Sequence, residues 1–141
     1  NTMRTYRYER TLQWSECDPA GIIFFPNYAI WMVDGLVKMF SSLGIDAHAV
    51  IDPKTRQGLP SVQLSMQFIK APQLLDQVTH EIHIEKIGGT SITVRHRIFQ
   101  GETLCMEATE TRVWATYSLT YPPTLAAVTV PDEVREILLG E

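Results

Sequence analysis

Residues 27–43 read N-Y-A-I-W-M-V-D-G-L-V-K-M-F-S-S-L, and the architecture of the chain follows from them. The pattern predicts an α-helix that Gly44 ends. Apolar side chains lie on nearly every side of such a helix, with interruptions at Asp34, Gly35, Lys38 and two serines. A helix that is apolar on most of its faces is buried on most of them. We therefore expect the remainder of the chain to wrap around this helix.

Four segments after the helix alternate between apolar and polar residues, as half-buried β-strands do. They span residues 61–69, 76–87, 90–100 and 102–118. Gly88 and Gly89 predict a tight hairpin turn between the second segment and the third. In the last segment the apolar positions change parity after Ala108, and a β-bulge near 109–112 would explain the change.

The remaining segments complete an α+β chain. Residues 4–15 alternate like a strand, and residues 45–60 hold the prolines and glycine of a loop. Pro131 begins a short helix over 131–139. This order predicts a five-stranded antiparallel sheet wrapped around one long central helix, in a single domain over 1–141. Because its strand edges need cover, we also expect a symmetric oligomer.

Composition and charge exclude several classes of protein. The chain has 141 residues, of which 45% are hydrophobic and 20% charged, so it is not a disordered chain. Its 12 basic and 16 acidic residues give 12 − 16 = −4, and without a basic stripe we expect no nucleic-acid partner. No apolar run reaches the ~18–20 residues that span a membrane. The polar N-terminus and only two cysteines, Cys17 and Cys105, favour a cytoplasmic protein.

Unusual residues gather in one segment, 16–28, with the sequence E-C-D-P-A-G-I-I-F-F-P-N-Y. Asp18 precedes a proline, which favours an extended backbone, and Gly21 allows a positive φ or a close approach. Phe24 and Phe25 lead into the start of the helix, where unpaired N–H groups carry partial positive charge. A carboxylate near such amides is half of an acyl-transfer site. The alternative is that Asp18 only caps the turn.

The residues of this segment carry a family resemblance. The pattern D-x-x-G-(x)4-P-N-Y with a following Trp resembles the signature of the 4-hydroxybenzoyl-CoA thioesterase family, whose fold is called the hot dog. The similarity continues through G-L-P-S-V at 58–62, E-K-I-G at 85–88, T-V-R-H at 93–96 and T-R-V-W-A at 111–115. The resemblance therefore covers nearly the whole chain and favours a catalytic role for Asp18.

This resemblance implies a thioesterase that cleaves an acyl-CoA to a carboxylate and free CoA. The residue matching Asp18 acts as nucleophile or general base, and the backbone amide matching Phe25 polarises the thioester carbonyl. Relatives form homodimers, usually doubled into homotetramers, with sites at the subunit interface. No metal and no separate cofactor are implied, since coenzyme A is part of the substrate. We expect substrate contacts from six residues: Gly21, Phe24, Asn27, Tyr28, Trp31 and Asp34.

The chain departs from the family pattern in three places. Phe25 stands where some relatives have a histidine, which favours the 4-hydroxybenzoyl type. Asp34 lies one residue beyond the position of a helix glutamate that other relatives use as catalytic acid. The hairpin at 88–90 lacks the basic residue that often meets the CoA phosphates. Four other basic residues remain for that role: Lys70, Lys86, Arg95 and Arg97.

The other reactive residue types have ordinary structural explanations. Cys17 is expected to be a small buried residue, and the histidines lack the spacing of metal ligands. His96 shares the parity of apolar neighbours, which predicts a core or interface histidine. The three tryptophans, Trp14, Trp31 and Trp114, are expected in the core.

The sequence leaves two functions open. The aromatic approach to the helix favours hydrolysis of an aromatic or short acyl-CoA. The alternative is a hot dog module that binds an acyl-CoA or another ligand without turnover. A hot dog dehydratase is disfavoured because no histidine with an acidic partner is visible in the sequence.

Overall fold

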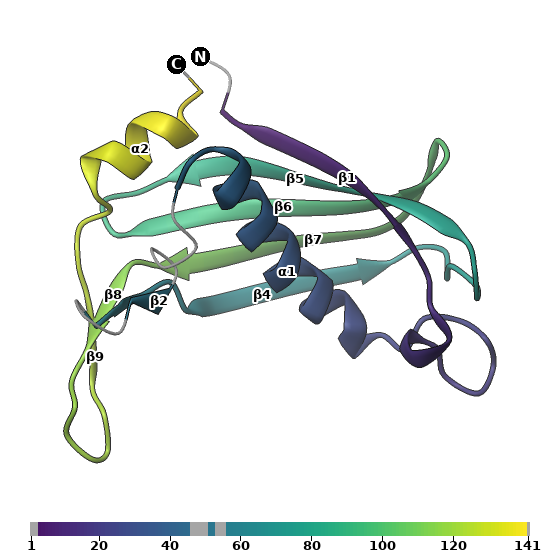
Figure 1. Ribbon diagram of the computed structural model, residues 1–141, viewed down its shortest axis with the longest axis horizontal. Helices are drawn as coiled ribbons and strands as arrows, with labels where there is room; N and C mark the ends of the chain where they lie inside the picture. The colour runs from purple at the N-terminus through teal and green to yellow at the C-terminus, as the bar shows by residue number, and fades with distance from the viewer. Residues whose placement is uncertain (1–2, 46–50, 53–55, 141) are drawn as a thin grey trace.

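The computed structural model describes residues 3–45, 51–52 and 56–140. Five strands form the main antiparallel sheet, in the order β1-β5-β6-β7-β4. Their bounds are β1 (Thr5–Thr11), β4 (Ser61–Phe68), β5 (Gln77–Ile87), β6 (Ser91–Gln100) and β7 (Thr103–Val113). Helix α1 (Pro26–Ser42) lies across one face of this sheet (Figure 1). The predicted α+β chain with a five-stranded antiparallel sheet is confirmed.

A second, smaller sheet was not predicted. It has the order β2-β3-β8-β9, with the bounds β2 (Ile51–Asp52), β3 (Gln57–Gly58), β8 (Ala115–Tyr117) and β9 (Leu125–Ala127). Strands of two or three residues are too short to show a period in the sequence. The β8–β9 hairpin projects away from the body of the molecule (Figure 1). Residues 46–50 and 53–55 of the expected loop lie outside the described residues.

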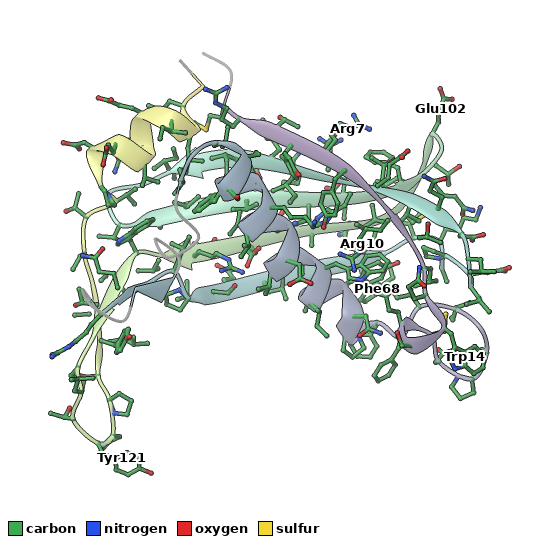
Figure 2. All side chains as sticks on the ribbon, in the orientation of Figure 1. Arg7, Arg10, Trp14, Phe68, Glu102 and Tyr121 are labelled. Atoms are coloured by element: carbon green, nitrogen blue, oxygen red, sulfur yellow. The ribbon has the colours of Figure 1, made fainter. Side chains whose placement is uncertain are left out.

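The first strand ends earlier than predicted. β1 stops at Thr11, and a 3-10 turn, η1 (Trp14–Glu16), replaces the rest of the expected strand. The Gln13 N–H donates to the Glu16 carboxylate at 2.9 Å and closes this turn. The turn leaves the Trp14 side chain 79% exposed, so its predicted place in the core is wrong (Figure 2).

The bulge predicted in β7 near 109–112 is also wrong. Ala108, Glu110 and Arg112 all face inward and are buried, so the parity of β7 continues through this stretch. The register between β7 and β6 shifts at Cys105, which is the extra residue on β7. The register between β4 and β7 shifts near Arg112, but there the extra residue is Val62 on β4. The prediction failed because it assumed that inward positions are apolar.

Helix α1 packs its inner face on the sheet and leaves an outer face uncovered. Pro26 lies in its first turn, and Gly44 follows its end with φ 78°. A Cβ atom on Gly35 would lie 2.7 Å from His80 Cε1, so glycine permits the close approach of helix and sheet. On the opposite face Ile30 is 57% exposed and Val33 49%. The expected burial on most faces is therefore incomplete in the single chain.

The inner face of the sheet contains a hydrogen-bonded series of polar side chains, called here the buried polar chain. The Tyr8 hydroxyl lies 2.7 Å from His80 Nδ1, and His80 Nε2 lies 2.9 Å from His96 Nδ1. His96 Nε2 lies 2.7 Å from Glu110 Oε2, while Arg112 Nε donates to Glu110 Oε1 at 2.7 Å. His96 is thus a buried core histidine, as predicted, and its contact with Glu110 is a pair of histidine and carboxylate that the sequence did not reveal.

Two members of the buried polar chain have shifted pKa values. Burial lowers the pKa of His80 well below 6.5, and its neighbours His96 and Arg10 act in the same direction. Burial by itself raises the pKa of Glu110, but the hydrogen bond with His96 and the Arg112 charge outweigh it and lower that pKa to about 2. Glu110 is therefore an anion held between two partners at neutral pH.

Strand β4 forms an edge of the main sheet and carries apolar residues on its surface. Val62, Leu64, Phe68 and the following Ile69 are all exposed, and we call this group the β4 edge.

In the described part of the chain, neither helix combines the length and apolar character that crossing a bilayer requires.

Candidate active site

The segment that carries Asp18 folds back on itself ahead of α1. The Asp18 N–H donates to the Ile22 carbonyl at 2.9 Å, and the Phe24 N–H donates to the Glu16 carbonyl at 2.9 Å. Gly21 adopts φ 80° in the connecting turn, and its N–H donates to the Asp18 carbonyl. This positive φ is the reason that the turn needs a glycine.

The Asp18 side chain is half-buried beside this turn. Its Oδ1 accepts the Ala20 N–H at 2.8 Å, so the alternative interpretation, a turn cap, accounts for one of its oxygens. Oδ2 has no hydrogen-bond partner among the described residues. One carboxylate oxygen is therefore fixed by the turn, and the other is available to a ligand.

The amide of Phe25 lies at the positive end of α1. Asn27 and Tyr28 use their N–H groups on the carbonyls of Phe24 and Phe25, at 2.9 and 3.1 Å, and Pro26 has no N–H. Within the described residues the Phe25 N–H has no such partner. A free amide at the N-terminus of a helix attracts an anion or a polarised oxygen.

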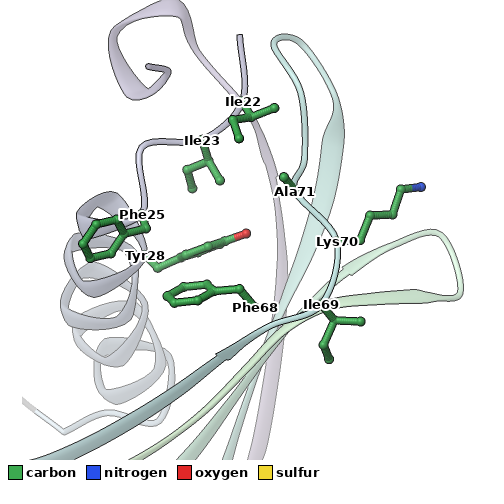
Figure 3. A pocket seen from close by; sticks show the side chains of 8 residues that line it. All are labelled: Ile22, Ile23, Phe25, Tyr28, Phe68, Ile69, Lys70 and Ala71. Atoms are coloured by element: carbon green, nitrogen blue, oxygen red, sulfur yellow. The ribbon is translucent and has the colours of Figure 1, made fainter. Parts of the chain in front are cut away.

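A cavity of about 210 Å³ opens beside the start of α1. Its lining residues are mainly apolar: Ile22, Ile23, Phe25, Tyr28, Phe68, Ile69, Lys70 and Ala71. The rings of Tyr28 and Phe68 are stacked at 5.8 Å, while the Lys70 side chain points away from them (Figure 3). Asp18 is not among the lining residues, but its backbone partner Ile22 is.

Tyr28 provides a polar atom in this apolar cavity. The residue is 2% exposed, and burial raises the pKa of its hydroxyl above the usual 10. The hydroxyl is therefore neutral at physiological pH, and it has no hydrogen-bond partner among the described residues. It is available to donate to a ligand.

Five of the six predicted contact residues do not line the cavity in the single chain: Gly21, Phe24, Asn27, Trp31 and Asp34. Phe24 packs edge-on against Phe25 at 5.9 Å, and Trp31 packs behind Tyr28 at 5.7 Å. The Asn27 side chain donates to the Glu16 carbonyl at 2.8 Å, and Asp34 is exposed on α1. Their contact with a substrate stays a prediction.

Sequence reasoning missed the opposite wall of the cavity. Phe68, Ile69 and Ala71 come from the end of β4, some forty residues after α1 begins, so no local pattern joins them to it. Lys70 was named only as one of several possible phosphate contacts. Cys17 is half-buried rather than buried. Across the described ranges, no three His, Cys, Asp or Glu side chains converge as metal ligands.

A family model covers nearly all of this structure. Residues 12–138 match the model described as the thioesterase-like superfamily. The chain belongs to the thioesterase-like superfamily. This assignment confirms the resemblance seen in the sequence and agrees with the prediction of a thioester hydrolase.

Individual members of the thioesterase-like superfamily are similar over most of the chain. It is 27% identical to 4-hydroxybenzoyl-CoA thioesterase of Pseudomonas sp. strain CBS-3 over 95% of this chain and 97% of the relative. The solved structure of that enzyme has a TM-score of 0.82, with 95% of this chain and 99% of that chain covered. A gentisyl-coenzyme A thioesterase structure is also 27% identical, with a TM-score of 0.80, covering 92% of this chain and 99% of that one.

A third structure shares the fold at lower identity. The 1,4-dihydroxy-2-naphthoyl-CoA thioesterase from Synechocystis is 19% identical, with a TM-score of 0.84, and 97% of each chain is covered. At that identity the likeness supports the fold alone.

Proposed function

We propose that this protein is an acyl-CoA thioesterase that hydrolyses an aromatic, 4-hydroxybenzoyl-like, or short acyl-CoA to the carboxylic acid and CoA. The observation that carries the proposal is the Phe25 amide, which has no partner among the described residues and lies at the start of α1 beside an apolar cavity. The named relatives act on 4-hydroxybenzoyl-CoA and gentisyl-CoA, which supports an aromatic acyl group.

The size of the cavity supports a small acyl group. Its volume of about 210 Å³ is below the roughly 300–1,000 Å³ of pockets for drug-sized ligands. An aromatic ring fits within this volume beside the stacked rings of Tyr28 and Phe68, and the CoA part extends outside. The outward-pointing Lys70 offers a positive charge to the CoA phosphates there (Figure 3).

The chemistry requires only a carboxylate and an oxyanion donor. With Asp18 as general base, its Oδ2 takes a proton from water, and the resulting hydroxide attacks the thioester carbon. With Asp18 as nucleophile, Oδ2 attacks that carbon itself, CoA thiolate leaves, and water hydrolyses the acyl-aspartyl anhydride. In both routes the Phe25 N–H stabilises the negative oxygen, and the thiolate leaves as the tetrahedral intermediate collapses. One such donor is worth roughly 3–4 kcal/mol.

The assembly is part of the proposal. Two residues of the apolar β4 edge, Phe68 and Ile69, also line the cavity. Exposed apolar strands of this kind need cover. We propose that a second copy covers this edge and that the homodimer, or its doubled homotetramer, is the active form.

Substitution of Asp18 tests the proposed function. We expect Asp18→Asn to lower kcat for benzoyl-CoA and 4-hydroxybenzoyl-CoA by about a hundredfold or more, because the amide cannot act as base or nucleophile. Release of free thiol measures the rate, with butyryl-CoA and palmitoyl-CoA as the short and long comparisons.

The control for this test is Asp132→Asn, the same change at an exposed position at the start of α2 (Asp132–Leu138). It should turn over at the wild-type rate. Full activity of Asp18→Asn would exclude the proposed mechanism. Tight binding of acyl-CoA without turnover by the wild-type protein would support the non-catalytic alternative.

A further inference from the structure

Glu16 joins the Asp18 segment to the start of α1 through its backbone carbonyl. That carbonyl accepts the Phe24 N–H at 2.9 Å and the Asn27 side-chain amide at 2.8 Å. These two donors come from residues on either side of Phe25 in the sequence. Glu16 itself lies two residues before Asp18. One carbonyl thus fixes the backbone around both groups that the proposed mechanism uses.

The Glu16 carboxylate extends this attachment into the helix. Its Oε2 accepts the indole N–H of Trp31 at 2.6 Å and the Arg10 guanidinium at 3.3 Å. Its Oε1 accepts the Gln13 N–H at 2.9 Å. Trp31 lies more than one turn inside α1, so the carboxylate fixes the helix to the segment before Asp18.

These contacts are largely removed from water. The Glu16 side chain is 17% exposed and its partner Arg10 22%. The Arg10 guanidinium also lies 4.6 Å from the centre of the Trp31 ring, as a cation–π pair (Figure 2 labels Arg10). Hydrogen bonds to a charged group in such surroundings are strong, and a buried donor without an acceptor is unfavourable.

We propose that Glu16 is a positioning residue that sets the spacing between the Asp18 carboxylate and the Phe25 amide. The inference rests on the proposed function, because it concerns the geometry of that same site. Glu16 does not line the cavity and contacts no substrate in this scheme. Its carboxylate acts by fixing where α1 begins relative to the turn that holds Asp18.

The test is Glu16→Gln, which keeps the size of the side chain but loses its charge. We expect kcat for 4-hydroxybenzoyl-CoA to fall about tenfold to hundredfold, because a small misplacement of reacting groups has effects of that size. KM should stay within about threefold, since the cavity is unchanged. The matched control is Glu9→Gln on β1, whose carboxylate accepts only the exposed Gln77 amide among the described residues and should retain wild-type kcat.

A second variant separates positioning from folding. Trp31→Phe removes the indole N–H that donates to Glu16 but keeps an aromatic ring in the core. It should lower kcat in the same way. The double variant with Glu16→Gln should lower log kcat by less than the sum of the two single decreases in log kcat. If Glu16→Gln is recovered unfolded, Trp31→Phe alone provides the test.

Combination with Asp18→Asn completes the experiment. Glu16→Gln should lower kcat little further in the Asp18→Asn variant, because Glu16 acts by positioning the Asp18 carboxylate, which that variant lacks. Wild-type kcat in both Glu16→Gln and Trp31→Phe, with Asp18→Asn inactive, would overturn this inference and leave the proposed function standing. A full further loss in the Asp18→Asn background would also overturn it. Full activity of Asp18→Asn would overturn both proposals.

Discussion

The inner face of the sheet buries polar side chains, whereas the β4 edge exposes apolar ones. Beneath α1 the chain buries His80, His96, Glu110 and Arg112, whereas the β4 edge leaves apolar side chains in contact with solvent. Each buried polar group has a partner at 2.7–2.9 Å in the buried polar chain. The apolar residues of the β4 edge have no comparable cover from the described part of the chain.

The difference shows that burial follows available partners as much as side-chain polarity. A buried ion pair is tolerated when each charge is matched, but removal of one partner is strongly unfavourable. An exposed apolar strand is tolerated when another surface covers it. The inner face is thus complete within one chain, and we expect the β4 edge to be completed by a second.

Removal of Glu110 should have the largest effect on the inner face. We expect Glu110→Ala to lower the free energy of unfolding by about 3–5 kcal/mol, because Arg112 would remain buried without its anion. Urea denaturation measures the loss. The control Glu102→Ala removes an exposed carboxylate in the β6–β7 turn and should change the free energy by less than about 0.5 kcal/mol. Equal effects of the two substitutions would contradict this account of the inner face.

Acid should weaken the same face in two stages. The pKa values of His80 and Glu110 are lowered by folding, so the unfolded chain binds protons at higher pH than the folded chain does. The contribution of His80 should decline as the pH falls below 6.5, and that of Glu110 from 4.5 down to about 2. Unfolding free energies measured across this range test the expectation.

His80→Gln isolates the first of these stages. It should flatten the decline in stability below pH 6.5, because the titrating group is gone. His83→Gln, on the outer face of β5, removes a histidine that contacts Thr5 and should leave that decline unchanged. If His80→Gln and the wild type show the same dependence on pH, burial of a neutral His80 is not its cause.

A substitution in the β4 edge should have the smallest effect on the stability of the folded chain, but it should clearly change the oligomeric state. We expect Leu64→Lys to shift the protein toward its monomer mass of 16.0 kDa, with unchanged circular dichroism, because a charge would then face the second copy. Light scattering measures the mass. Leu119→Lys, in the β8–β9 hairpin, changes an exposed leucine away from this edge and should leave the mass unchanged. A monomeric wild type would contradict the expected cover.

The sequence allowed prediction of the sheet and helix because their burial follows a simple period. Ile92, Val94 and Ile98 are inward and buried, as their alternation indicated. The same reasoning failed at Glu110 and Arg112, because these inward polar residues pair with each other along β7 and Glu110 also pairs with His96 on β6. Asp18 and Phe25 were proposed from one local motif, whereas the cavity wall at 68–71 depends on tertiary packing that no local pattern records.

The absence of a side chain at Gly35 links the core to the chemistry proposed at the far end of the helix. An α-helix behaves as a stiff rod with a rise of about 1.5 Å per residue, so Phe25 lies roughly 15 Å from Gly35 along α1. Bulk added at Gly35 would meet His80 and the Tyr8 hydroxyl and lift the middle of the rod from the sheet. Because the helix is stiff, its N-terminal end would move as well. The lack of a side chain at Gly35 therefore helps to fix the position of the Phe25 amide beside the cavity.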